Sequence, residues 1–176
     1  MILEHEHLIV RAEYTTPIRD NEAAEAWLAD LIKAIGMEVL VGPFSIYSDM
    51  VGNTGITAGA ILSTSHCVLH TFEDENHSVL QLDLYSCSTF SIFDVLERTQ
   101  KFFNPYRLEY KFLDRKRNLK FVIDFPAKKS YKNEINNNRE VSNSGQDTRS
   151  NSLVSRVRSL YTRTVSRFPA ILEKLR

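Results

Sequence analysis

One stretch of the sequence, residues 55–87, concentrates the side chains that can do chemistry. Hydroxyl residues and two histidines, His66 and His70, surround one serine, Ser65, and a thiol follows at Cys87. A hydroxyl or a thiol becomes a nucleophile or a proton donor when a suitable base or acid lies beside it. The set is therefore compatible with nucleophilic catalysis or with metal binding.

A Ser-His-Asp hydrolase is the first chemistry that such a set suggests. However, Ser65 lacks the G-x-S-x-G turn that exposes the nucleophile of α/β-hydrolases. Serine and histidine residues that are close in sequence also say little about a triad, which is defined in space. The sequence gives hydrolysis little support.

A metal centre is the second possibility, with ligands drawn from His66, His70 and His77 and from Asp74 or Glu75. On one strand, His66 and His70 face the same side, but four residues of extended chain separate them by about 13 Å. That distance is too long for both imidazoles to bind one ion directly. We therefore predict no metal site.

The order of the motifs along the chain is more informative than any single residue. Four segments follow one another: Gly55-Ile56-Thr57-Ala58, Thr64-Ser65-His66, His70-Thr71 and Asp83-Leu84-Tyr85-Ser86-Cys87. In addition, His7-Leu8 opens the first apolar run. This combination resembles the small, prokaryotic class of S-adenosylmethionine decarboxylase, a self-cleaving pyruvoyl enzyme, over about residues 5–125.

The resemblance implies a proenzyme that cuts its own chain. Ser65 would attack the carbonyl group of Thr64, form an ester and, after elimination and hydrolysis, become a pyruvoyl group. Thr57 and His70 match the hydroxyl and the imidazole that assist this processing, and Cys87 matches the acid that protonates the product. The pyruvoyl carbonyl forms a Schiff base with the substrate amine and accepts the electrons left by carbon dioxide.

The resemblance also implies a substrate and an assembly. The substrate is S-adenosylmethionine, whose decarboxylation supplies the aminopropyl donor for spermidine and other polyamines. Asp74 matches the carboxylate that meets the ribose hydroxyls, and Glu75 could replace it. Family members are homodimers whose active site draws on both protomers. The net charge of zero gives no reason to expect a nucleic-acid partner.

The chain departs from the family pattern at three places. Thr64 replaces a glutamate, Glu73 and Asp74 stand where the family has proline and glutamate, and the spacing from His70 to Cys87 is longer. These changes leave two alternatives open. One is a pyruvoyl-dependent decarboxylase of an amino acid such as arginine or ornithine, and the other is a regulatory paralogue that does not cleave itself.

The elements that position these residues follow from the apolar pattern. Asp20 is predicted to cap a helix that ends at Gly36, and a second helix is expected over residues 91–103. Strand character marks residues 7–14, 37–47, 56–62, 67–72, 79–85, 106–113 and 118–125. Because Pro43 cannot donate to a ladder, residues 37–47 are expected at an edge or a bend. The order predicts an α+β fold, a two-layer sandwich of a largely antiparallel sheet with two helices on one face.

Charge divides the chain into an acidic part and a basic part. The 176 residues carry no net charge, but residues 126–176 carry +7 and residues 1–125 carry −7. We expect a decarboxylase-like domain over residues 1–127, a disordered linker over 128–152 and a basic amphipathic tail over 153–176. The tail could contact a partner or an anionic surface.

The composition favours a soluble protein of the cytoplasm. Hydrophobic residues make up 43% of the chain and charged residues 25%, without an apolar window long enough to span a membrane. The amino terminus does not have the pattern of a secretion signal. Cys67 and Cys87 are therefore expected as free thiols, with Cys67 serving only in packing.

Overall fold

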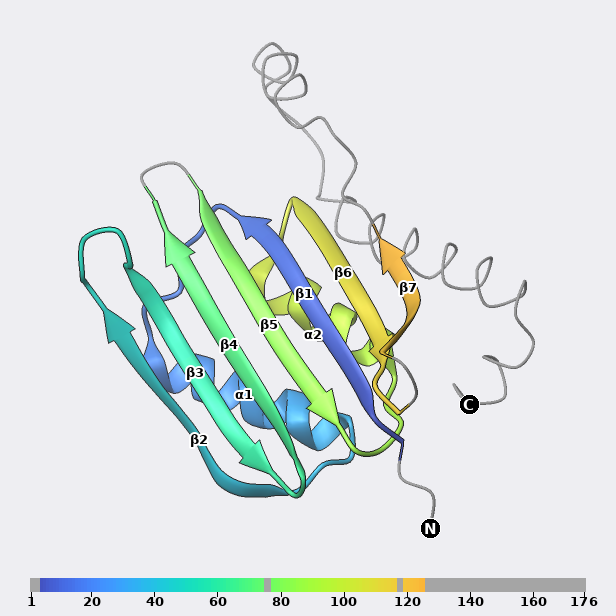
Figure 1. The fold of residues 1–176 in the computed structure, drawn as a ribbon. Coiled ribbons are helices and arrows are strands. Elements are labelled where there is room, and N and C mark those ends of the chain that lie inside the picture. The colour runs from blue at the N-terminus through green and yellow to red at the C-terminus, as the bar shows by residue number, and fades with distance from the viewer. Residues whose placement is uncertain (1–3, 75–76, 117–118, 126–176) are drawn as a thin grey trace, which may run out of the picture.

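The computed structural model describes residues 4–74, 77–116 and 119–125 (Figure 1). Within these residues, seven strands form one sheet in the order β2-β3-β4-β5-β1-β6-β7, and all neighbouring strands are antiparallel. The strands are β1 (Glu6–Tyr14), β2 (Val39–Ser48), β3 (Gly55–Leu62), β4 (Ser65–Glu73), β5 (Ser78–Ser86), β6 (Arg107–Asp114) and β7 (Lys120–Phe125).

Two helices, α1 (Asn21–Ala34) and α2 (Ile92–Phe103), cover one face of this sheet (Figure 1). Asp20 caps α1 because its carboxylate accepts hydrogen bonds from two backbone N–H groups of the first turn. Gly36, just past the end of α1, has a φ of 72°, as expected for a residue that stops a helix. The core lies between the helices and the sheet and includes Leu8, Val10, Tyr14, Trp27, Leu28, Leu31, Leu69, Leu82, Leu84, Val95 and Phe112.

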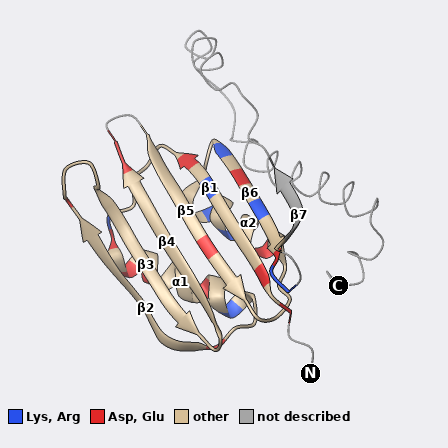
Figure 2. Cartoon of the chain, viewed as in Figure 1, with Lys and Arg blue, Asp and Glu red and all other residues tan. Residues whose placement is uncertain are grey.

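The opposite face of the sheet, which we call the open face, is not covered by any helix of the described residues (Figure 1). Its apolar half lies on β2, β3 and β4 and exposes Val41, Phe44, Ile46, Ile61 and Phe72. Neither β2 nor β3 contains a charged residue, whereas acidic and basic residues lie on β1 and β6 (Figure 2). The open face is therefore apolar on one side and charged on the other.

The structure confirms the predicted α+β sandwich and each of its predicted strands and helices. The ends of the elements lie within two residues of the predicted ones. Strand β2 is at an edge of the sheet, and its pairing with β3 shifts register on either side of Val41, next to Pro43. Both expectations for this strand are thus confirmed.

The predicted linker over residues 128–152 and the predicted tail over 153–176 lie outside the described residues. In the part of the chain that the structure describes, no helix is long and apolar enough to span a membrane.

Candidate active site

Strands β3 and β4 join in a two-residue turn, Ser63-Thr64, between the paired residues Leu62 and Ser65. Thr64 has a φ of 63°. A β-branched residue adopts this left-handed conformation only at a cost of roughly 1–3 kcal/mol. The strained residue therefore directly precedes Ser65, at the peptide bond that the resemblance predicts as the cleavage site.

Cys87, just after the end of β5, lies against this peptide bond. Its backbone N–H donates to Ser65 Oγ at 3.0 Å, and Thr64 Oγ1 donates to its Sγ at 2.7 Å. The hydroxyls of Thr64 and then Ser65 lower the pKa of the Cys87 thiol, because their hydrogen bonds stabilise the thiolate. Serine, threonine and thiol thus form one cluster of three residues, with Ser65 buried and Cys87 partly exposed.

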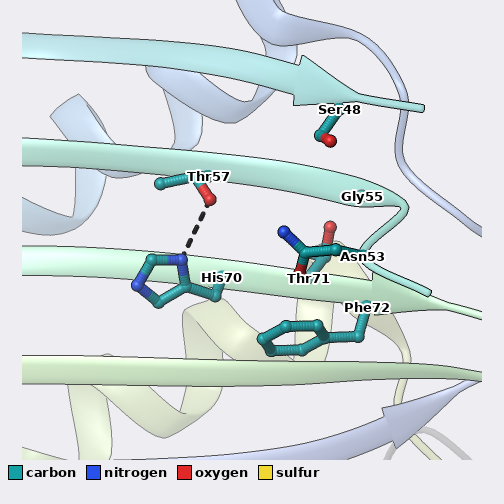
Figure 3. Close-up of a pocket in the computed structure, with 7 residues that line it drawn as sticks. All are labelled: Ser48, Asn53, Gly55, Thr57, His70, Thr71 and Phe72. Carbon is teal, nitrogen blue, oxygen red and sulfur yellow. Dashed lines mark hydrogen bonds between the residues drawn. The ribbon is translucent and has the colours of Figure 1, made fainter. Parts of the chain in front are cut away.

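Thr57 and His70 form a second group of candidate residues and lie directly opposite each other on β3 and β4. Thr57 Oγ1 lies 3.0 Å from His70 Nδ1, and both side chains point onto the open face (Figure 3). A pocket of about 280 Å³ lies beside them. Its lining comprises Ser48, Asn53, Gly55, Thr57, His70, Thr71 and Phe72.

The structure does not bring these two sets of residues together within one chain. Ser65 and His70 are five residues apart on β4, so their side chains lie on opposite faces of the sheet. Ser65 is buried on the helix-covered face with Cys67 and Leu69, and the strand separates it from His70 by about 17 Å. A chain on its own therefore has no imidazole of His70 beside Ser65.

Asp74, one of the two predicted substrate carboxylates, directly follows the far end of β4. Asp74 Oδ2 is 3.3 Å from His77 Nδ1 in the connection to β5, and Glu75 is outside the described residues. The neighbouring Glu73 is buried instead, where its carboxylate pairs with Arg19 at 3.0 Å. Of the two described carboxylates, Asp74 is the one that remains exposed to a ligand.

The structure shows a third cluster, which lies on the open face and which the sequence analysis does not predict. Asp83 Oδ1 lies 3.0 Å from both His7 Nε2 and His66 Nε2. The hydrogen bond from His7, followed by that from His66, lowers the pKa of Asp83, and partial burial opposes the shift. Asp83 and the two histidines occur in the recognised motifs, but their meeting depends on the register of β1, β5 and β4, which the motifs do not contain.

Cys67 is a core residue, as predicted. It is fully buried, and this burial raises the pKa of its thiol. Among the described residues, no group of three or more histidine, cysteine, aspartate or glutamate side chains is arranged to hold a metal ion.

Comparison with known proteins adds independent information on the family. A family model described as S-adenosylmethionine decarboxylase matches residues 6–116, which is more than half of the chain. The matched range contains every candidate residue discussed above, from His7 to Cys87. A search of curated proteins found no match.

Proposed function

The chain belongs to the S-adenosylmethionine decarboxylase family, and we propose that Ser65 is the serine from which its pyruvoyl group forms. Members of this family are pyruvoyl-dependent carboxy-lyases. The reaction is the decarboxylation of S-adenosylmethionine for polyamine synthesis, and the pyruvoyl group derives from a serine of the chain itself.

The contact of Cys87 with the Thr64–Ser65 bond carries the assignment to Ser65. The Cys87 N–H holds Ser65 Oγ, and Thr64 is strained at the bond that must break. In the proposed cleavage, Ser65 Oγ attacks the Thr64 carbonyl carbon and an ester replaces the amide. Loss of the Ser65 α-hydrogen then releases Thr64 as a carboxylate, and hydrolysis of the dehydroalanine gives the pyruvoyl group and ammonia.

The residues around Ser65 fit the group that would replace it. A pyruvoyl carbonyl binds the substrate amine and accepts the electrons that departing carbon dioxide leaves behind. Cys87 lies beside Ser65, and its thiol can deliver a proton when it is protonated. We assign to Cys87 the protonation of the product α-carbon, as a general acid.

Thr57 and His70 are proposed to act on the Ser65 of a second copy of the chain. Within one chain they lie on the face of the sheet opposite to Ser65. They are surrounded by the exposed apolar residues of the open face, a kind of surface that commonly marks an interface. A homodimer across the open face would cover this surface. In that dimer, the Ser65-containing turn would reach the partner's imidazole and hydroxyl only around the end of the sheet, where Leu62 and Ser65 pair.

The substrate is proposed to bind beside the same pair. The pocket next to Thr57 and His70 is bounded by Asn53 and the ring of Phe72, and Asp74 follows Phe72 by two residues (Figure 3). An exposed carboxylate can accept hydrogen bonds from two ribose hydroxyls. We therefore propose Asp74 as the ribose ligand, with Glu75 beside it in sequence.

Intact mass under denaturing conditions tests the assignment of Ser65. Freshly purified protein should give two chains, residues 1–64 and residues 65–176, the second with a blocked amino end. Carbon dioxide release from S-adenosylmethionine should appear together with these chains. Cleavage at any other bond, or turnover by a chain that stays intact, would rule out Ser65 as the pyruvoyl precursor.

Arginine and ornithine are the informative competing substrates, because the residues at positions 73 and 74 differ from the family pattern. The same preparation should release carbon dioxide from S-adenosylmethionine and not from either amino acid. Release from an amino acid alone would assign the pocket to a substrate without a nucleoside.

A further inference from the structure

The hydroxyl of Thr64 contacts two acceptors at the turn. Thr64 Oγ1 lies 2.7 Å from Cys87 Sγ and 2.7 Å from the Ser63 carbonyl oxygen. A hydroxyl has a single proton, so it can donate to only one of them at a time. The Cys87 thiol in turn lies 3.6 Å from the same Ser63 oxygen, within reach of an S–H donor.

These contacts allow two arrangements that differ by one proton. With a neutral thiol, Thr64 donates to the Ser63 oxygen and the S–H group of Cys87 has an oxygen acceptor nearby. With a thiolate, the Thr64 hydroxyl turns and donates to sulfur, which is a charge-assisted and stronger hydrogen bond. Rotation of one hydroxyl therefore accompanies the ionisation of Cys87.

The groups that lower the pKa of the Cys87 thiol are hydrogen-bond donors, of which Thr64 contributes most. Within the described part of the chain, no lysine, arginine or histidine contributes to this shift. Thr64 is also fixed in place, because Leu62 and Ser65 are paired on either side of the turn. The hydroxyl thus reaches Cys87 as a consequence of the hairpin geometry.

We propose that Thr64 is a positioning residue, whose hydroxyl holds the Cys87 thiol beside Ser65 and sets the protonation state of that thiol. The importance of this role for turnover rests on the proposed function of Cys87 as the general acid. Cleavage would leave Thr64 as the carboxyl-terminal residue of the upstream fragment. The residue that breaks from Ser65 is therefore the same residue that controls the thiol.

The rate at which iodoacetamide alkylates Cys87, measured against pH in full-length protein, tests the proposal. Only the thiolate reacts, so the midpoint of the profile gives the thiol pKa. Ser65→Ala serves as the common background, because every chain then stays intact. The variants in this background are Thr64→Val, which keeps the shape and removes the hydroxyl, and Thr64→Ser, which keeps the hydroxyl. Peptide mass analysis separates Cys87 from the buried Cys67.

Thr64→Val should move the midpoint to higher pH and slow alkylation at pH 7 by about three- to tenfold, the effect of one lost hydrogen bond. Thr64→Ser should retain the original profile. Identical profiles for all three proteins would overturn the proposal, and so would a Thr64→Ser profile that matches Thr64→Val. If Thr64→Val does not fold, Thr64→Ala replaces it with the same expected shift.

This experiment and the test of the proposed function can fail separately. A wild-type chain that never cleaves, together with a shifted Thr64→Val profile, would preserve the role of Thr64 and reject the assignment of Ser65. A wild type that cleaves at Ser65, together with an unshifted Thr64→Val profile, would preserve the assignment of Ser65 and reject the role of Thr64.

Discussion

In the proposed cleavage, the nucleophile is the Ser65 hydroxyl, which attacks the carbonyl carbon of the preceding residue, Thr64. We predict that Ser65→Ala gives a single uncleaved mass and no release of carbon dioxide above background. Ser63→Ala is the matched control, because it removes a hydroxyl from the same turn and leaves the Ser63 carbonyl in place. It should cleave as the wild type does. A Ser65→Ala chain that splits at position 64 would contradict the mechanism.

The Thr57–His70 pair should contribute through proton transfer. His70→Ala is expected to slow self-cleavage by about 10²–10⁴-fold, the usual contribution of a positioned acid or base. Thr57→Val should slow cleavage too, because it removes the hydroxyl that lies 3.0 Å from His70 Nδ1, while Thr57→Ser should retain most of the rate. The time course of the intact mass after synthesis measures these rates. Equal rates for Thr57→Val and Thr57→Ser would argue against a role for the hydroxyl.

Asp83 should make stability depend on pH in the acid range. Its pKa in the folded chain is lowered, chiefly by the hydrogen bond from His7, below the unfolded value of about 3.9. Ionised Asp83 therefore stabilises the fold above about pH 4, and this contribution is lost as the pH falls through the folded pKa. Because Asp83 is partly exposed, Asp83→Asn should cost only about 0.5–1 kcal/mol at neutral pH.

Urea unfolding between pH 2 and pH 7 measures this effect, where the difference between wild type and Asp83→Asn should vanish at the acid end. Asp49→Asn, in an exposed loop, should unfold like the wild type throughout. A constant difference for Asp83→Asn at every pH would mean that the change acts through shape and not through charge.

At the scale of single residues, the sequence predicts which residues are candidates for the site better than it predicts which of them are in contact. Ser65 and Cys87 are in contact, in keeping with the roles that the resemblance implies for them. Cys67, which matches no family motif, is buried, as predicted. The separation of Ser65 from His70 follows from the period of two in a strand, yet it becomes visible only when the start of β4 is known. The contact of Asp83 with two histidines requires the registers of three strands, and a single sequence does not specify these.

Among the elements, β3 depends on a glycine at its first residue. Gly55 has a φ of 146°, and a Cβ atom there would lie 2.0 Å from the backbone oxygen of Thr71 on β4. We predict that Gly55→Ala destabilises the protein by about 2–5 kcal/mol, from backbone strain and steric overlap together. The pocket beside Thr57 should also be distorted, because Gly55 and Thr71 both line it.

Gly52→Ala provides the matched control for the steric part. Gly52 also has a positive φ, of 80°, but a Cβ there would meet no atom within 4 Å. Its cost should be the conformational one alone, about 1–2 kcal/mol. Urea unfolding of both variants separates the two contributions, and equal losses would mean that the close approach of β3 to β4 relaxes freely.

The elements themselves could be predicted because local signals agree with the tertiary packing. Asp20 marks the start of α1, and the alternating apolar residues of β1 and β5 match the face that α1 and α2 cover. Pro43 predicts that the pairing of β2 is irregular. The positions of the register shifts could not be predicted, since they depend on how β3 pairs with β2. What local signals could not indicate is which side chains gather on the uncovered face, because this depends on the registers between the strands.

At the scale of the whole molecule, the two halves of the open face differ in whether contacts within the chain satisfy their side chains. On β1 and β6, Arg11 pairs with Glu13 and Glu109, and Arg107 pairs with Glu13, so these charges are satisfied within the chain. The apolar half has no such partners, and its large side chains, with Ile46 at 67% and Phe44 at 55% exposure, remain in contact with water. Covering that half is favourable by roughly 25 cal/mol per Å² of apolar surface.

We therefore predict that a charge in the apolar half weakens a dimer. Ile46→Glu places a carboxylate directly across from Thr57 and should shift the mass measured by light scattering towards the monomer, with slower self-cleavage. Ala29→Glu adds the same charge on the exposed side of α1 and should change neither property. A wild-type protein that is monomeric and still cleaves would contradict assembly through the open face.

Mixed dimers distinguish an active site shared between chains from one contained in a single chain. Neither Ser65→Ala nor His70→Ala should cleave efficiently alone. When the two are co-expressed in equal amounts, random pairing places half of the His70→Ala chains beside a partner that has His70. If the imidazole acts across the dimer, about half of all His70→Ala chains should therefore split at Ser65. If it acts within its own chain, none should, because the chain that retains Ser65 lacks its imidazole. Since β4 holds Ser65 and His70 on opposite faces, a single chain does not bring the two side chains together, and the co-expression result decides whether a partner supplies the imidazole.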